Sequence, residues 1–170
     1  FVFSCYTGLA YIDIFNLTKD QLSKGIDGNL WIITNRQKTG SASNIPLLPV
    51  AEEIIKKYEN HPVSSNSGKL LPVYTNQKVN EYLKTIAENC GINKKLTFHC
   101  ARHTFATTVT LGNNVSMESV SKMLGHKSIK TTQHYAKILD SKVSQDMENL
   151  KLVLEKKNEV QKENEKKLGS

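Results

Sequence analysis

The stretch that decides the fold is Phe98-His99-Cys100-Ala101-Arg102-His103-Thr104-Phe105-Ala106. Residues three apart lie on one face of a helix, so His99 and Arg102 are predicted to point together out of an apolar segment. An arginine in such a place suits a phosphate, because its guanidinium can bind two oxygens at once. An ordinary amphipathic helix with surface His and Arg would give the same pattern. The apolar side of this helix is predicted to hold Phe98, Ala101, Phe105, Ala106 and Val109.

Downstream of this helix the chain offers two further polar positions. Leu124-Gly125-His126 is followed nine residues later by Tyr135. We expect a helix that is capped by Ser116 and ends at Gly125, and a further helix over residues 129–139 that carries Tyr135. The residues just before Tyr135 are polar, which predicts an exposed hydroxyl, whereas a buried aromatic ring is the alternative.

Upstream of residue 98 the pattern changes from helix to sheet and back. Short helices are predicted over residues 1–6 and 9–16, and residues 21–48 favour a small antiparallel sheet. Helices are then expected over 49–58 and 75–89, with a polar loop at 60–68 between them. The strand-like segments are 30–34 and 45–48, and Pro46 and Pro49 predict an edge strand. The core of the first helices is predicted to include Leu9, Ile12, Ile14 and Leu17. Together these elements predict a mainly helical α+β domain with a small three-stranded antiparallel sheet at one edge.

The charge of the chain indicates the kind of partner that it binds. The 170 residues carry a formal net charge of +7. Residues 141–170 hold seven lysines and six acidic residues, so most of the excess lies on residues 1–140. A basic globular part favours a polyanion such as nucleic acid, although a generic basic surface would carry the same charge.

Cysteine spacing and apolar runs bound the class of protein. Cys5, Cys90 and Cys100 are odd in number and lack Cys-x-x-Cys spacing, which predicts reduced residues that fill the core. No apolar run approaches the ~20 residues of a membrane span, so no membrane partner is expected.

Because the chain begins at Phe1 in the middle of a pattern, we expect a piece of a longer protein whose missing part precedes Phe1.

The order of these motifs resembles that of the tyrosine recombinases, the phage-integrase family. The matching residues are Thr7-Gly8-Leu9, Lys38, His99-x-x-Arg102-His103, Leu124-Gly125-His126 and Tyr135. The resemblance implies site-specific DNA recombination by a mobile-element or phage-type integrase, with strand cleavage through a 3′-phosphotyrosyl intermediate. It also implies that no cofactor, ATP or catalytic metal is needed, because the energy of the broken bond is kept in the intermediate.

The resemblance further assigns a role to each matching residue. Tyr135 would be the nucleophile, and Arg102 would bind phosphate oxygens. His99 would assist the phosphate and the tyrosine proton, while His126 would contact a phosphate oxygen. Lys38, at the tip of the predicted hairpin, would be the general acid that protonates the leaving 5′-oxygen.

One position departs from the family pattern. The family has Thr-Gly-Leu-Arg, and the fourth residue here is Ala10, so the first catalytic arginine is missing. Arg36 lies two residues before Lys38, and alternate residues of a strand share a face. We therefore expect Arg36 to supply the absent guanidinium from the hairpin; a solvated strand arginine is the alternative. Asp13 fits the family's acidic position, and it would support the site from behind, as would His103.

The chain is expected to divide into a tyrosine recombinase catalytic domain at residues 1–140 and a C-terminal amphipathic helix and charged tail at 141–170. The missing N-terminal part would hold the family's core-binding domain. Val143, Met147, Leu150 and Leu154 form a narrow apolar seam. The resemblance implies double-stranded DNA as partner, a synaptic tetramer in which the 141–160 helix can bind a neighbouring copy, and accessory DNA-bending proteins. It places the protein in the cytoplasm with the nucleoid. Docking of the tail in cis is an equal alternative.

Three other functions fit parts of this pattern. A DNA-binding relative that has lost catalysis would explain Ala10, and a type IB topoisomerase would share the tyrosine chemistry. His99 and His103, four residues apart, have a spacing that can chelate zinc on a helix. The sequence shows no third ligand at a matching spacing, so no metal site is expected.

Overall fold

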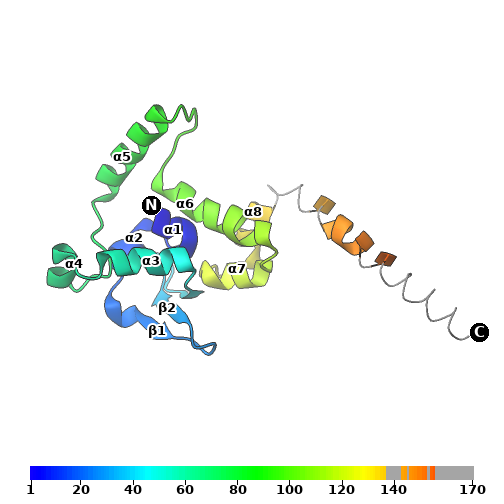
Figure 1. Cartoon of the computed structure of the whole chain (residues 1–170), viewed down its shortest axis with the longest axis horizontal. Coiled ribbons are helices and arrows are strands. Elements are labelled where there is room, and N and C mark those ends of the chain that lie inside the picture. The colour runs from blue at the N-terminus through cyan, green and yellow to red at the C-terminus, as the bar shows by residue number, and fades with distance from the viewer. Residues whose placement is uncertain (137–142, 145, 153, 156–170) are drawn as a thin grey trace, which may run out of the picture. The chain divides into compact units, whose positions relative to one another are not determined.

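The computed structural model describes residues 1–136, 143–144, 146–152 and 154–155. The chain divides into two units, Phe1–Ala136 and Lys137–Ser170, and every site residue predicted above lies in the first. The first unit is mainly helical, with a three-stranded antiparallel sheet along one edge (Figure 1). The predicted fold class is therefore confirmed.

Two short helices open the chain. Helix α1 (Val2–Thr7) ends at Gly8, and α2 (Tyr11–Phe15) follows after three residues. Leu9 and Leu17 are fully buried, as predicted. Ile12, in contrast, is 42% exposed, so its predicted place in the core is wrong. Helix α2 has only five residues, and Asp13 and Ile14 are the ones that it turns inward.

The sheet has the strand order β1-β2-β3, so β3 is an edge strand, as its prolines predicted. Its register pairs Trp31 with Ser23 on one side and with Pro46 on the other. The last strand starts and ends earlier than residues 45–48, because Leu48 already serves as the N-cap of the next helix. The strands are β1 (Leu22–Lys24), β2 (Leu30–Asn35) and β3 (Ala42–Pro46).

Three helices follow the sheet, and two of them were predicted closely. Helices α3 (Pro49–Tyr58) and α5 (Asn76–Asn89) match the expected ranges, and Thr75 caps α5 by accepting the N–H of Lys78. The predicted polar loop at 60–68 is wrong, because it contains the helix α4 (Pro62–Ser67). Its ends are the reason: the His61 side chain accepts the N–H of Val63, and Gly68 closes the helix at φ 68°.

The last part of the first unit carries the predicted motifs. Helix α6 continues through a π-helical turn, η2, and a short 3₁₀ turn, η3, before α7 and α8. Ser116 caps α7 through the N–H of Ser119, as predicted, and Gly125 follows its end. The predicted residues 137–139 of the last helix lie outside the described part. The elements are α6 (Phe98–Thr104), η2 (Phe105–Thr110), η3 (Leu111–Asn113), α7 (Met117–Met123) and α8 (Ile129–Ala136).

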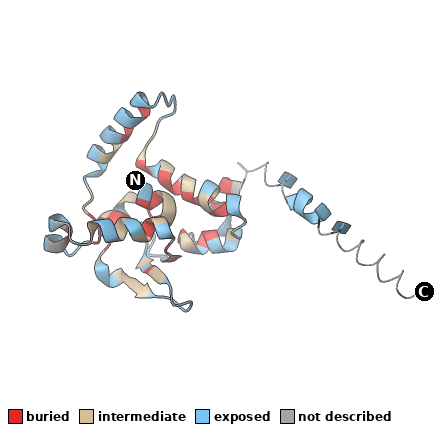
Figure 2. Ribbon diagram, in the orientation of Figure 1, coloured by how far each residue is buried: buried red, intermediate tan, exposed pale blue. Residues whose placement is uncertain are grey.

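The core lies between the first helices, the sheet and α6 (Figure 2). Its buried members include Phe3, Leu17, Ile32, Ile45 and Phe98. The three cysteines are free, but Cys90 is exposed, so the prediction that all three fill the core is wrong for this one. Its position as C-cap, just beyond the end of α5, explains the exposure.

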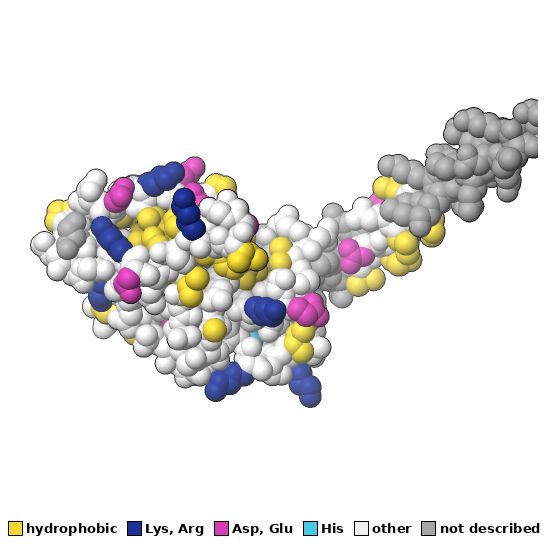
Figure 3. Space-filling view, turned by 90° about the horizontal axis from the view of Figure 1, so that it is seen from below, with side chains coloured by type: hydrophobic (Ala, Val, Ile, Leu, Met, Phe, Trp, Pro, Cys, Tyr) yellow, Lys and Arg dark blue, Asp and Glu magenta, His cyan; other side chains and the backbone are white. Residues whose placement is uncertain are grey.

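The second unit is helical where it is described, and hydrophobic side chains are visible on this part in Figure 3. Val143, Met147, Leu150 and Leu154, which form the apolar seam predicted from the sequence, are exposed. The predicted tail beyond residue 155 lies outside the described residues. Among the described residues, no helix is long and apolar enough to cross a bilayer.

Candidate active site

Helix α6 brings Arg102 into the interior of the first unit. Phe98, Ala101 and Phe105 are buried as predicted, and Arg102 itself is only 5% exposed. The side-chain amide oxygen of Asn80 on α5 accepts the N–H of Phe98 at 2.8 Å, which ties α5 to the first turn of α6. Because this turn also carries His99, the contact with α5 helps to set the position of both predicted site residues.

The guanidinium of Arg102 is held by backbone carbonyls. Its Nη1 donates to the Gly8 carbonyl and its Nη2 to the Leu124 carbonyl, each at 2.6 Å. Gly8 has a φ of 71°, and a side chain there would collide with the rings and methyl groups of Phe105 and Leu124. The Thr7-Gly8 motif therefore allows α1, α6 and α7 to approach closely enough for these bonds.

Arg36 reaches the same place from the hairpin. Its Nε lies 2.9 Å from Asp13 Oδ2, in an ion pair that is almost closed to solvent. Its Nη1 donates to the Leu124 carbonyl at 3.1 Å, while Asp13 Oδ1 accepts the N–H of Gln37 at 2.9 Å. The expectation that Arg36 and Lys38 share a strand face is wrong, because β2 ends at Asn35. Arg36 turns inward from the hairpin turn, whereas Lys38 is exposed.

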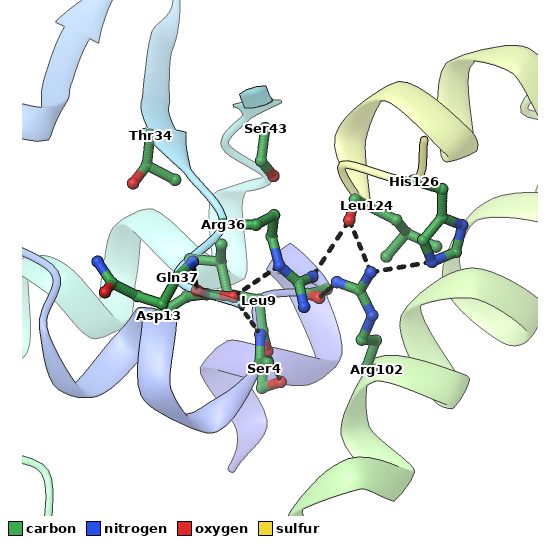
Figure 4. Close-up of polar contacts among 12 residues, drawn as sticks. Ser4, Leu9, Asp13, Thr34, Arg36, Gln37, Ser43, Arg102, Leu124 and His126 are labelled. Carbon is green, nitrogen blue, oxygen red and sulfur yellow. Dashed lines mark hydrogen bonds and ion pairs between the residues drawn. The ribbon is translucent and has the colours of Figure 1, made fainter. Parts of the chain in front are cut away.

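The Leu124 carbonyl therefore receives hydrogen bonds from both guanidinium groups (Figure 4). Leu124 is the C-cap of α7, where helix carbonyls carry partial negative charge. Arg36 and Arg102 are also the only arginines in the sequence. Burial, together with the charge of Arg36, lowers the pKa of Arg102 to about 10, although Tyr135 and Asp13 oppose the shift. Arg102 therefore still carries its charge at neutral pH.

His126 lies beside Arg102 on the other side. Its Nε2 is 3.0 Å from Arg102 Nη2, and its Nδ1 is 2.8 Å from the hydroxyl of Thr132 on α8. Burial lowers the pKa of His126 to about 4, and the positive charges of Arg102 and Arg36 add to the shift. The ring is therefore neutral at physiological pH.

Tyr135 is buried, being only 7% exposed, so the prediction of an exposed hydroxyl is wrong. Its ring is parallel to that of His126, with centroids 6.2 Å apart, and it meets the His103 ring edge-on at 4.9 Å. The polar neighbours misled the prediction, because most of them face solvent while Thr132 and Tyr135 face inward. The nucleophile predicted from the sequence thus lies next to Arg102 and His126.

His99 and Ala10 border the same space as Arg102. An open pocket of about 390 Å³ is lined by residues that include Ala10, Asn76, His99 and Arg102. Burial, and then the positive charges of His103, Arg102 and Arg36, lower the pKa of His99. The His99 and His103 rings meet edge-on, with centroids 4.8 Å apart. Within the described ranges, no three His, Cys, Asp or Glu side chains are grouped so that they could hold a metal ion.

The comparison with known proteins gives the family. The model of the phage integrase family matches residues 1–142. The chain belongs to the phage integrase family. It is 31% identical over 142 residues to tyrosine recombinase XerC of Rickettsia canadensis (strain McKiel), a match that covers 77% of this chain and 43% of that protein. It is 34% identical over 113 residues to tyrosine recombinase XerD of Halalkalibacterium halodurans, which covers 58% of this chain and 36% of that protein. The chain thus spans less than half the length of these relatives.

Solved structures share the fold at lower identity. The crystal structure of XerA recombinase matches with a TM-score of 0.68 and 23% identity over 85% of this chain and 54% of that chain. A lambda integrase dimer bound to a COC′ core site matches with a TM-score of 0.60 and 19% identity, over 79% of this chain and 49% of that chain. At these identities the likeness supports the integrase fold alone.

Two side chains of this integrase-family site were not found by sequence reasoning, and a third residue, Gly125, was named only as a motif position and the end of a helix. Thr132 binds His126, Gly125 lies against Arg36, and the buried Ser43 donates to the Met123 carbonyl, which fastens β3 to α7. Thr132 could have been found, because it lies three residues before Tyr135 and so shares its helix face. Ser43 gives no such signal, because its partner is a backbone oxygen.

Gly125 makes room for Arg36, which predicts the effect of a side chain at this position. A Cβ there would lie 2.6 Å from Arg36 Cγ and 3.2 Å from the Ala42 carbonyl, at a φ of 61°. Gly125→Ala should lower the free energy of unfolding by about 2–4 kcal/mol, from the left-handed backbone and the overlap together. Urea denaturation checks this value.

Gly40→Ala is the matched control for that change. Gly40 has a φ of 65°, and a Cβ there would meet nothing within 4 Å, so only the backbone term remains. We expect a loss of about 1 kcal/mol. Equal losses in the two variants would show that Arg36 does not occupy the space beside Gly125.

The low pKa of His126 predicts a pH dependence of stability. As the pH falls, the ring in the unfolded chain takes up a proton near its ordinary pKa of about 6.5. The ring in the folded protein takes up its proton only near its lowered pKa of about 4. The stabilisation is complete above pH 6.5 and is lost as the pH falls through this window. Because His126 is partly exposed, solvent screening limits the effect to about 1 kcal/mol.

His126→Gln should flatten this dependence. Urea denaturation at pH 7 and pH 4.5 measures the difference, and His134→Gln, an exposed histidine on α8, serves as control. An unchanged slope in His126→Gln would show that the ring is not held neutral by Arg102 and Arg36.

Proposed function

We propose that residues 1–136 form the catalytic part of a site-specific DNA recombinase that cleaves and rejoins strands through a 3′-phosphotyrosyl intermediate. The observation that carries the proposal is the convergence of Arg36 and Arg102 on one carbonyl oxygen, beside the buried Tyr135. Two guanidinium charges with one carboxylate, Asp13, leave an excess positive charge that a phosphodiester would neutralise.

The chemistry of cleavage then follows from the side chains. The Tyr135 oxygen attacks the phosphorus and forms the new O–P bond, while the bond from phosphorus to the 5′-oxygen breaks. His99 accepts the proton of the tyrosine hydroxyl, and Lys38 gives a proton to the leaving 5′-oxygen. Attack by another strand's 5′-hydroxyl reverses these steps, so no external energy source is consumed.

Hydrogen-bond donors stabilise the charge that develops on the phosphate. Arg102, His126 and Arg36 contact the non-bridging oxygens. Arg36 takes the place of the family's first arginine, whose position is occupied by Ala10 in this chain. Its support is geometric, because Arg36 shares the Leu124 carbonyl with Arg102 and is fixed by Asp13. Asp13 also binds the N–H of Gln37, the residue before Lys38, so it holds the base of the hairpin turn.

The substrate is double-stranded DNA under this proposal. The net charge of +7 supports it, as does the lambda integrase dimer of the same fold, which is bound to a COC′ core site. The exposed seam of the second unit supports assembly with further copies on DNA, with the seam as the contact. A DNA-binding relative without catalysis is the second candidate, and it is favoured by Ala10 alone.

Covalent capture on DNA tests the proposal. The protein, at its full natural length, is incubated with a pool of duplexes that carry a nick and a randomised core, because a nick traps the intermediate by releasing the short 5′-end. A complex that survives denaturing electrophoresis is the expected result. Binding without such a complex would favour the inactive relative, and plasmid relaxation without strand exchange would favour a type IB topoisomerase.

A further inference from the structure

The two contacts of His126 fix the position of its proton. A guanidinium has donors only, so His126 Nε2 must accept from Arg102 Nη2, which lies 3.0 Å away. The single proton of the neutral ring is then on Nδ1, and it is donated to Thr132 Oγ1 at 2.8 Å. The lowered pKa of His126 agrees with a neutral ring.

This arrangement is the wrong one for binding a phosphate through Nε2. A non-bridging phosphate oxygen accepts hydrogen bonds, and a lone pair on Nε2 would repel it. The ring can contribute only if Nε2 carries a proton, which requires the partner of Nδ1 to become a donor. A carbonyl or carboxylate at that place could never donate, whereas a hydroxyl can do either.

Thr132 is positioned either to accept a hydrogen bond from His126 Nδ1 or to donate one to it. Thr132 is fully buried, and its hydroxyl oxygen lies 2.8 Å from His126 Nδ1. It belongs to α8, three residues before Tyr135, and the two side chains lie on one face of the helix. The hydroxyl can therefore reach His126 only when α8 is seated with Tyr135 in the site.

We propose that Thr132 is a positioning residue whose hydroxyl lets His126 change tautomer when a phosphate binds, and couples this change to the seating of Tyr135. Without DNA the hydroxyl accepts from Nδ1–H. When a phosphate takes the Arg102 donor, the hydroxyl turns and donates to Nδ1, and Nε2–H donates to a phosphate oxygen. One proton leaves Nδ1 for solvent and one arrives at Nε2, so the charge of the ring does not change. The phosphate step rests on the proposed function.

Histidine ¹⁵N spectra of the DNA-free protein test the first half of the proposal. His126→Gln identifies the signals, and Thr131→Val, at an exposed threonine of the same helix, is the matched control. Wild type, Thr132→Ser and Thr131→Val should all show the Nδ1–H tautomer. Thr132→Val keeps the shape of the side chain but removes the acceptor of Nδ1–H, so the ¹⁵N shift of Nδ1 should move while Arg102 still holds the proton on Nδ1. An unchanged Nδ1 shift in Thr132→Val overturns the proposal.

Two further measurements test the second half. In Tyr135→Phe protein bound to the nicked duplex, the proton should move to Nε2, and a proton that stays on Nδ1 overturns the proposal. The rate of covalent-complex formation should fall about 10-fold in Thr132→Val and recover in Thr132→Ser, because the change weakens one phosphate donor. A rate in Thr132→Val equal to the rate in Thr132→Ser would also overturn the proposal.

The outcomes for the two proposals can be told apart. If the protein never forms a covalent complex, the proposed recombinase function fails, while the DNA-free spectra still decide whether Thr132 accepts Nδ1–H. If the complex forms but the His126 signals and the rate do not change with Thr132, the recombinase function stands and the role of Thr132 is refuted.

Discussion

Replacing Arg36 by alanine should lower the rate of covalent-complex formation by about 100-fold to 1,000-fold, the loss expected for one preorganised donor at a developing anion. Only Arg102 would then remain as a guanidinium at the phosphate, since the sequence has no third arginine. Arg36→Lys should recover little, because an ammonium cannot bind both Asp13 and the Leu124 carbonyl in the same geometry. Single-turnover rates on the nicked duplex measure both effects.

The Arg36 variants need two controls. Lys24→Ala removes an exposed charge at the end of β1, the strand that pairs with β2, and should leave the rate near that of wild type. Urea denaturation separates loss of chemistry from loss of the ion pair with Asp13. The most discriminating variant combines Ala10→Arg with Arg36→Ala, which restores an arginine at the position where the family has it. Ala10 borders the open pocket beside Arg102, so part of the activity should return. Near-full activity of Arg36→Ala would refute the proposal that Arg36 replaces the missing first arginine.

Replacing Tyr135 by phenylalanine should abolish the covalent complex while DNA binding is retained. The change removes only the hydroxyl, so the ring can keep its contacts with His103 and His126. Stability should change little for the same reason. Gel electrophoresis under denaturing and native conditions measures the two quantities separately.

Tyr74→Phe is the matched control, because Tyr74 is 65% exposed and lies outside the cluster around Arg102. It should form the covalent complex at the rate of wild type. A complex that persists in Tyr135→Phe would mean that another residue attacks the phosphate. Loss of DNA binding together with the complex would instead show that the hydroxyl is needed to assemble the site.

The sequence predicted the elements whose signals are local. The helices at 49–58 and 75–89 have a proline or threonine at their start and apolar residues at helical spacing, and the structure has them at nearly these bounds. Helix α4 was missed, because Pro62–Ser67 is polar and is held by its ends alone. A short helix without an apolar face leaves no periodicity to detect.

The site was predictable in its residue types but not in its geometry. The family motifs named Arg102, His126 and Tyr135, and these three do lie together. The buried state of Tyr135 depends on His103 and His126, which come from other parts of the chain, so its sequence neighbours could not reveal it. The Leu124 carbonyl, which holds both arginines, is a backbone group and has no sequence signature at all.

The inward turn of Arg36 has a different cause from the one expected from the sequence. Strand alternation would place it beside Lys38, yet it lies beyond the end of β2. Its position comes from Asp13, the Leu124 carbonyl and the space left by Gly125. These contacts join residues that are distant in the sequence, and only the folded chain brings them together.

The central claim is that Tyr135 attacks a phosphate held by Arg36 and Arg102, and mapping the DNA adduct tests it most directly. The covalent complex is digested with nuclease and protease, and the peptide that carries a nucleotide is identified by mass spectrometry. We expect one adduct, a 3′-phosphate ester on Tyr135. An adduct on another tyrosine, or no adduct from protein that binds the nicked DNA, would contradict it.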